Sequence, residues 1–206
     1  MAHGRSPLDP CQSSPYSPLV RTAFKEWAIV VDALGRGDQI LILRKGGIAE
    51  GRGGFQAEHP RFLFFPTLFH QQRESVLPAA QVRYDEVAPQ FPPPEVLRLE
   101  LCAEVVSWRK LDSLAAVERL RGQHIWRDDV LAQRFEWGQT QNIFALAVRV
   151  SRLPRHLELP MLPSYGGCKS WIELAHEIPT DDAQPVLSER PFQTSLHQFE
   201  SALAAG

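Results

Sequence analysis

The clearest indication of the fold comes from Ile40-Leu41-Ile42-Leu43, which is followed at once by Arg44-Lys45-Gly46-Gly47. Consecutive apolar residues that include β-branched side chains, with glycine nearby, predict a strand that is buried on both faces. That strand ends where the two cations and a glycine-rich turn begin. A second apolar run, Phe62-Leu63-Phe64-Phe65, predicts another buried strand that stops at Pro66. Together the two runs place a sheet in the first half of the chain.

Upstream of the first strand, apolar residues recur at the helical spacing i, i+3, i+4, i+7 and i+10. The spacing predicts an amphipathic helix with an N-cap at Thr22 and a stop at Gly35 and Gly37. Glu26 then lies at the edge of the apolar stripe. The stripe itself consists of Phe24, Trp27, Ala28, Val31 and Leu34.

Downstream, the segment from Val96 to Trp108 alternates in part between apolar and charged residues, which predicts a half-buried strand. Further patterns predict helices over residues 70–75, 111–120, 128–137 and 191–204, and strands over 143–150 and 169–174. This loose alternation predicts an α+β fold with a mixed sheet, an N-terminal helix and a second, β-rich half. By analogy alone, the strands from Val96 to Leu174 suit a compact barrel resembling the PUA-like RNA-binding fold.

A proline-rich stretch over residues 78–95 divides the chain. Its prolines favour an extended polyproline II conformation, which makes a stiff spacer. Residues 1–18 are rich in proline and serine, and we expect them to form a disordered tail. The predicted segments are this tail, an N-terminal α/β half over 19–77, the spacer, and a C-terminal α+β half over 96–206. A single integrated domain that includes both halves stays open as an alternative.

The bulk composition is that of an ordinary globular protein. Of the 206 residues, 44% are hydrophobic and 22% are charged, and the formal net charge is -2. This net charge creates no overall positive potential that would attract nucleic acid or a membrane. Any surface that binds a polyanion must therefore be a local cluster of cations. No apolar run approaches the length of about 18 residues that a membrane span needs. The three cysteines fit neither a C-x-x-C motif nor a zinc ribbon, and no signal peptide is evident, so we expect a cytoplasmic protein.

The block Arg44-Lys45-Gly46-Gly47 is the first candidate site, as a binding site for an anion. Glycines let backbone N–H groups converge on an anion, Arg44 offers a planar fork, and Lys45 adds a point charge. If the two apolar strands pair in parallel, Thr67, His70 and Gln71 would lie near Lys45. The block lacks the residue order of a phosphate-binding Walker loop. A strand that simply ends in solvated charges and a turn is the alternative interpretation.

A catalytic alternative uses Glu26, Lys45 and His70, with His70 as a general acid or base near neutral pH. A helical glutamate beside a strand-end lysine is similar to the arrangement in PD-(D/E)xK nucleases. The diagnostic acid is missing, because Leu43 stands two positions before Lys45. The histidines form no i, i+4 pair and no H-E-x-x-H motif, so we predict no metal site. A lone histidine such as His70 is equally suited to capping or packing.

A second candidate cluster runs from Tyr165 to Trp171, with the sequence Tyr-Gly-Gly-Cys-Lys-Ser-Trp. Tyr165 and Trp171 could stack on a base while Lys169 faces a phosphate. Cys168 could act as a nucleophile if Lys169 lowers its pKa. A glycine turn that leads into a strand with a core tryptophan explains the same residues without function. His124-Ile125-Trp126 is interpreted as a packing corner.

Several blocks resemble one family of uncharacterised, mainly bacterial proteins, the domain of unknown function 1802. They extend over about residues 23–192, and their order and spacing carry the resemblance. It implies that the two halves are one evolutionary unit, and it implies no activity, cofactor or catalytic residue. The blocks are Lys25-Glu26-Trp27, Leu43 to Ile48, Phe65-Pro66-Thr67 with His70-Gln71, His124-Ile125-Trp126, Tyr165 to Trp171, and Pro185 to Ser188.

The sequence thus leaves three functions open. The first is an anion-binding module for nucleic acid or a nucleotide, centred on the Arg44-Lys45-Gly46-Gly47 loop. The second is a divergent hydrolase or nuclease that uses Glu26, Lys45 and His70. The third is a non-catalytic protein-interaction factor. Cofactor and partner stay undetermined, and so does the question of whether the protein is an enzyme.

Overall fold

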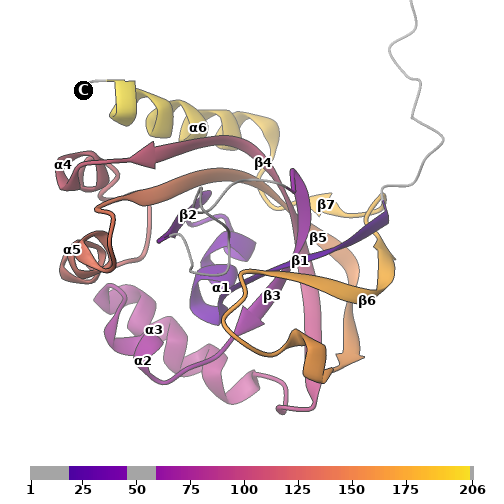
Figure 1. The fold of residues 1–206 in the computed structure, drawn as a ribbon. Helices are drawn as coiled ribbons and strands as arrows, with labels where there is room; N and C mark the ends of the chain where they lie inside the picture. Colours follow the sequence, from indigo (N-terminus) through magenta and orange to yellow (C-terminus); the bar gives the residue numbers. More distant parts are fainter. Residues whose placement is uncertain (1–18, 46–58, 205–206) are drawn as a thin grey trace, which may run out of the picture.

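A mixed sheet of seven strands forms the centre of the protein (Figure 1). The computed structural model describes residues 19–45 and 59–204. The strand order is β2-β5-β4-β3-β1-β6, with β7 beside β5, and only the β1–β3 pair is parallel among the pairs of described strands. The predicted α+β class with a mixed sheet is confirmed. The strands are β1 (Leu19–Trp27), β2 (Leu41–Arg44), β3 (Arg61–Thr67), β4 (Val96–Leu111), β5 (Ile143–Pro160), β6 (Trp171–Pro179) and β7 (Gln184–Pro185).

The sheet combines strands from both halves of the chain. β6 comes from the second half and pairs with β1 from the first, rather than with β4 or β5. The long β4–β5 ribbon carries two irregularities in register, between Leu99 and Leu101 and between Val105 and Ser107. Such irregularities bend a ribbon and increase its twist, and Figure 1 shows β4 and β5 curving around the molecule. Among the described strands, no backbone pairing joins β2 to β6, so the curled sheet is open.

The first predicted helix is wrong in its N-terminal part. Residues 19–27 form the strand β1, and α1 begins only at Ala28 and ends at Arg36 (Ala28–Arg36). β1 lies between β3 and β6, and its side chains alternate between two cores: Phe24 packs in the larger cluster and Ala23 in the smaller one. Hydrogen bonds on both edges and burial on both faces outweigh the helical spacing of a few apolar residues.

The proline-rich segment is also different from the prediction. Residues 78–87 form the helix α3 (Pro78–Val87), and a 3-10 turn, η1 (Ala88–Gln90), follows it. Pro78 occupies the first turn of the helix, where its missing N–H costs no hydrogen bond. Arg83 then holds α3 on α1 through a bidentate contact with Asp32, at 2.9 and 3.0 Å. The segment therefore packs on the first half instead of acting as an extended spacer.

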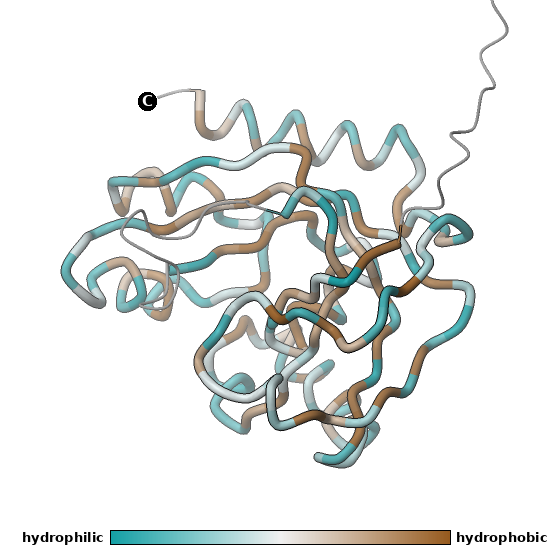
Figure 2. Tube along the Cα trace, turned by 45° about the vertical axis from the view of Figure 1, so that its right-hand side comes forward, coloured by the Kyte–Doolittle hydropathy of each residue, from teal (hydrophilic) through white to brown (hydrophobic). Residues whose placement is uncertain are grey.

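The remaining helices lie around the sheet (Figure 1). Four of them agree with the predicted positions, although several are shorter: α2 (Gln71–Glu74), α4 (Leu114–Glu118), α5 (Asp128–Glu136) and α6 (Glu189–Ala204). The 3-10 turn η2 (Pro163–Tyr165) was not predicted. Along α6 the hydropathy alternates from turn to turn (Figure 2), and Phe192 and Phe199 are its buried residues. No helix in the described ranges is both long and apolar enough to cross a membrane.

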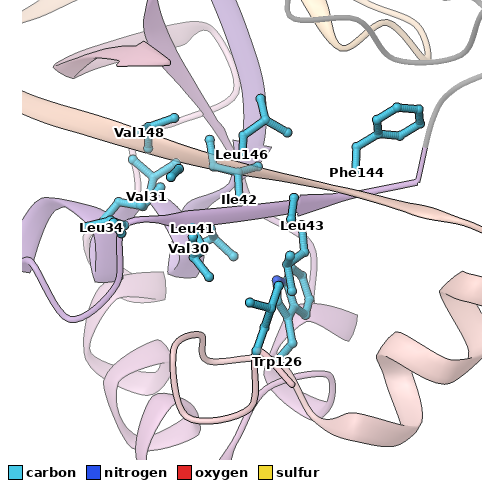
Figure 3. Packing of buried hydrophobic residues seen from close by; sticks show 14 of the residues in the cluster. Val30, Val31, Leu34, Leu41, Ile42, Leu43, Trp126, Phe144, Leu146 and Val148 are labelled. Carbon is cyan, nitrogen blue, oxygen red and sulfur yellow. The ribbon is translucent and has the colours of Figure 1, made fainter. Parts of the chain in front are cut away.

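The larger core joins β2 to the helices beside it. Figure 3 shows Leu41, Ile42 and Leu43 of β2 with Leu146 of β5 and with Trp126 below them. The predicted burial of this strand on both faces is confirmed, because all three of its apolar residues are at most 2% exposed. Trp126 is 1% exposed, so the predicted packing corner at residues 124–126 is confirmed as well.

We expect Gly37→Ala to destabilise the protein by at least about 1 kcal/mol, because Gly37 ends α1 in a conformation that alanine adopts only with strain. Its φ is 76°, and an added Cβ would lie 2.6 Å from Leu187 Cδ2. Denaturant unfolding measures the change. Gly122→Ala is the matched control: Gly122 has the similar φ of 82°, but its added Cβ would meet nothing within 4 Å. An equal loss in both variants would mean that the contact with Leu187 contributes nothing.

Candidate functional site

Arg44 connects the two candidate clusters that the sequence keeps far apart. Its Nη1 donates a hydrogen bond to the backbone oxygen of Lys25 (3.1 Å), and its Nη2 donates to Ser170 Oγ (2.6 Å). The guanidinium also lies 4.9 Å from the centre of the Phe24 ring. Arg44 belongs to β2, which is at the opposite end of the strand order from β6, the strand that follows Ser170. One side chain therefore reaches across the open side of the curled sheet.

Glu26 lies at the end of β1, and it is 3% exposed. This corrects the prediction that it sits at the edge of a helix. Its Oε1 accepts a hydrogen bond from the backbone N–H of Trp27 (2.7 Å), and its Oε2 lies 3.8 Å from Arg44 Nη1. Because α1 starts at Ala28, the carboxylate is also placed at the positive end of that helix. A buried anion is therefore balanced by a nearby cation and a backbone donor.

Lys45 interacts with the end of α5 and the segment that follows it. Its Nζ donates hydrogen bonds to the backbone oxygens of Phe135 (2.8 Å) and Thr140. Phe135 belongs to the last turn of α5, where a cation is favourable because the final carbonyls of a helix lack partners. Burial lowers the pKa of the ammonium group. The predicted backbone nest at Gly46 and Gly47 lies outside the described residues.

The residues after β3 do not meet β2 as expected, because β3 pairs in parallel with β1 while β2 pairs with β5. Thr67 therefore lies beside Glu26, and its Oγ1 donates a hydrogen bond to the backbone oxygen of Glu26 (3.2 Å). His70 and Gln71 are exposed. Within the described ranges, no hydrogen bond or ion pair links either of them to Glu26 or Lys45, or links Glu26 to Lys45.

The aromatic residues of the second cluster are packed rather than free. Tyr165 is 3% exposed, and its hydroxyl accepts a hydrogen bond from the Ala175 N–H (2.9 Å). Trp171 is half-buried, with its ring centre 4.6 Å from that of Phe24 and 5.3 Å from that of Phe62. Both residues are used to build the fold.

Lys25 is the cation that the sequence did not single out. Its Nζ donates a hydrogen bond to the backbone oxygen of Gly167 (3.0 Å) and lies 5.4 Å from the centre of the Phe65 ring. Burial lowers the pKa of Lys25, Cys168 opposes that change, and the charge of Lys169 adds to it. Lys169 itself is exposed. Two ammonium groups close enough to influence each other thus flank the turn over residues 166–170.

A cavity of about 400 Å³ opens beside Lys25, and we call it the strand-end cavity. Lys25 and Thr67 supply its polar side chains, and apolar or aromatic groups form most of its wall. A second hollow of about 380 Å³, which Lys169 lines, shares Leu162 and Tyr165 with the first. The lining of the strand-end cavity is Lys25, Phe65, Thr67, Met161, Leu162, Pro163, Tyr165 and Gly166.

A second cation that sequence reasoning missed is Arg134, on α5. Its Cζ lies 3.8 Å from the centre of the Trp126 ring and 4.7 Å from that of Trp27. Glu26 and Arg44 both act on it electrostatically. The described residues contain no cluster of three or more histidine, cysteine, aspartate or glutamate side chains that could hold a metal ion.

Comparison with known proteins gives a family and a distant structural likeness. The family model described as "Domain of unknown function (DUF1802)" matches residues 23–198. No curated protein matches the chain. Among solved structures, ASCH from Zymomonas mobilis is similar at 11% identity and a TM-score of 0.42, over 85% of this chain and 92% of that one. A point mutant of the same protein gives 12% identity and a TM-score of 0.41, over 85% and 95% of the two chains.

Proposed function

Because the chain belongs to the DUF1802 family, whose description assigns no activity, we propose a function from the site itself: the protein binds anionic ligands, with single-stranded nucleic acid as the ligand class. The observation that carries this proposal is the position of Lys25. Its ammonium group stands beside Phe65 at a cavity of about 400 Å³, with Thr67 in the wall. A cation beside an aromatic-lined hollow suits a nucleotide, whose phosphate and base need these two surroundings.

The size of the strand-end cavity favours a single strand over a duplex. About 400 Å³ is near the lower end of the range for small-molecule sites, so it suits one nucleotide at a time. A base has to leave its stack to enter such a hollow, and that costs least in an unpaired strand. Lys169 extends the positive charge along the neighbouring hollow, where the next phosphate would pass. The net charge of -2 makes this local cationic surface decisive.

The centre of this proposed site differs from the one predicted from sequence. Arg44 contributes by fixing the turn before β6 through Ser170, and it thereby positions Lys169 and the backbone around Gly167. Lys45 is occupied by the carbonyls at the end of α5. Lys169 makes no described hydrogen bond and Lys25 makes one, to Gly167, so both are expected to keep ammonium donors for a ligand. Arg44 is a positioning residue.

The double variant Lys25→Ala/Lys169→Ala should bind short single-stranded oligonucleotides at least tenfold more weakly at low salt. The magnitude of the slope of log K against log salt concentration should fall by about 1.4, because each phosphate contact contributes about 0.7 for a single strand. Fluorescence anisotropy with labelled oligonucleotides measures both quantities. The matched control is Arg155→Ala/Arg190→Ala, which removes two exposed cations that line neither hollow.

Because Lys25 also holds the turn through Gly167, the single variant Lys169→Ala is a second probe that disturbs no described hydrogen bond. It should lower the salt slope by about 0.7. Equal affinities of the double variant and its control, or affinities that do not depend on salt, would contradict the proposal. Tighter binding of a duplex than of the single strand would contradict the assignment of the ligand class.

A further inference from the structure

The guanidinium of Arg134 packs against the rings of two tryptophans, Trp126 and Trp27. Its guanidinium lies against Trp126, with 3.8 Å from Cζ to the ring centre, and 4.7 Å from the ring of Trp27. The two rings meet edge to face with their centres 4.7 Å apart. Trp126 is 1% exposed and therefore gives a rigid wall. The guanidinium plane is thus fixed before any ligand arrives, which reduces the entropy that binding would cost.

The donors of this guanidinium are unused in the part of the chain that the structure describes. An arginine side chain carries several N–H donors in a fixed fork. Arg73, Arg83, Arg127 and Arg149 each present that fork to a carboxylate. Within residues 19–45 and 59–204, Arg134 makes no side-chain hydrogen bond and no ion pair within 4.0 Å. A partly desolvated cation without an acceptor is unfavourable, and an incoming oxyanion would relieve that cost.

The charge around Arg134 favours an anion over a neutral ligand. Burial lowers the pKa of its guanidinium to about 10, Glu26 opposes that change, and Arg44 adds to it. Arg134 and Arg44 therefore share the single carboxylate of Glu26, and that carboxylate already accepts the Trp27 N–H. The surplus of positive charge favours an oxyanion.

We infer that Arg134 is an oxyanion-binding residue that takes a phosphate group, in a site separate from the strand-end cavity. Its planar fork donates two parallel hydrogen bonds to two phosphate oxygens, while Trp126 and Trp27 hold the fork in place. A phosphate group offers this fork two acceptor oxygens and more than one negative charge, which offsets the surplus of positive charge. The group is half-buried rather than sealed in the core. Arg134, Trp126 and Trp27 take no part in the proposed nucleic-acid site.

The test uses the full chain and inorganic phosphate as the probe, at constant ionic strength maintained with sodium chloride. Phosphate should raise Tm in a saturable manner and shift the indole N–H resonance of Trp27, which a nonspecific salt effect would not do. Arg134→Gln should weaken phosphate binding at least tenfold. Arg127→Gln is the matched control, because Arg127 precedes α5 and its guanidinium pairs with Asp129 (2.6 Å).

Equal phosphate affinities of the wild type and Arg134→Gln, or an absence of saturation in the wild type, would overturn the inference. If Arg134→Gln does not fold, Arg134→Lys keeps the charge but loses the fork, and it should still bind phosphate several-fold more weakly than the wild type. A nucleoside monophosphate that binds more tightly than phosphate, while the nucleoside alone does not bind, would identify a nucleotide as the source of the phosphate. Oligonucleotide binding that persists in Arg134→Gln leaves the proposed function intact.

Discussion

Glu26→Ala is expected to lower the free energy of unfolding by about 3–5 kcal/mol, the usual cost of removing one partner from a buried ion pair. The carboxylate is 3% exposed and stands 3.8 Å from Arg44 Nη1, and its charge also offsets that of Arg134. Its removal leaves these guanidinium groups without compensation and deprives the Trp27 N–H of its acceptor. Glu26→Gln should cost less, because the amide oxygen still accepts that hydrogen bond.

Equilibrium unfolding in urea measures this effect, and Glu173→Ala is its control. Glu173 forms an ion pair with Arg21 at 3.3 Å, but both side chains are more than half exposed. Such exposed pairs contribute about 0–1 kcal/mol. If Glu26→Ala costs no more than Glu173→Ala, the charge balance at the end of β1 does not stabilise the fold. The distinction matters for function, because the same carboxylate sets the charge that Arg134 experiences.

The second large effect is a loss of stability in mild acid. His124 is 6% exposed, and burial lowers its pKa from the ordinary value of 6.5 to about 4. Asp128 opposes this change and Arg121 adds to it, and no described residue pairs with its Nδ1. The imidazole of His124 therefore takes up a proton near pH 6.5 in the unfolded chain but only near pH 4 in the folded protein. Stability is complete above pH 6.5 and decreases by about 3 kcal/mol as the pH falls to 4.

Unfolding experiments across pH 7.5 to 4 test this prediction when the wild type is compared with His124→Gln. Over that interval the wild type should lose about 3 kcal/mol of unfolding free energy relative to His124→Gln, because the carboxylates that titrate in the same range are common to both. His156→Gln serves as the control, since His156 is exposed. Parallel curves for the wild type and His124→Gln would show that another group carries the acid sensitivity.

Much of the fold could be predicted because its most regular helices and strands can be recognised from short stretches of sequence. The continuous apolar runs of β2 and β3 and the stripe of α6 need no partner to be recognised. β1 was mistaken for a helix because Phe24, Trp27, Ala28 and Val31 happen to follow helical spacing. The evidence for a strand lies in its neighbours β3 and β6, one of which is more than a hundred residues away.

The candidate site shows the same limit. Arg44 could be selected from sequence because a cation after a buried strand is a local signal. The role of Lys25 depends on Gly167, 142 residues further on, and that of Arg134 depends on Trp27 and Trp126. The expected meeting of His70 and Gln71 with Lys45 assumed that β2 pairs with β3. The chain instead pairs β2 with β5, a choice that depends on contacts across the whole molecule.

The reach of Arg44 across the open side of the sheet has a mechanical consequence. Neighbouring strands elsewhere are joined by ladders of backbone hydrogen bonds. In the described part of the chain, the polar contacts from β2 to the β1–β6 side come from the Arg44 side chain, which forms hydrogen bonds with Lys25 and Ser170 and an ion pair with Glu26. A backbone ladder separates only when many bonds break together, whereas this connection depends on a single side chain. We therefore expect the sheet to open more easily beside β2 than between its paired strands, and loss of the Arg44 side chain to make that opening more frequent.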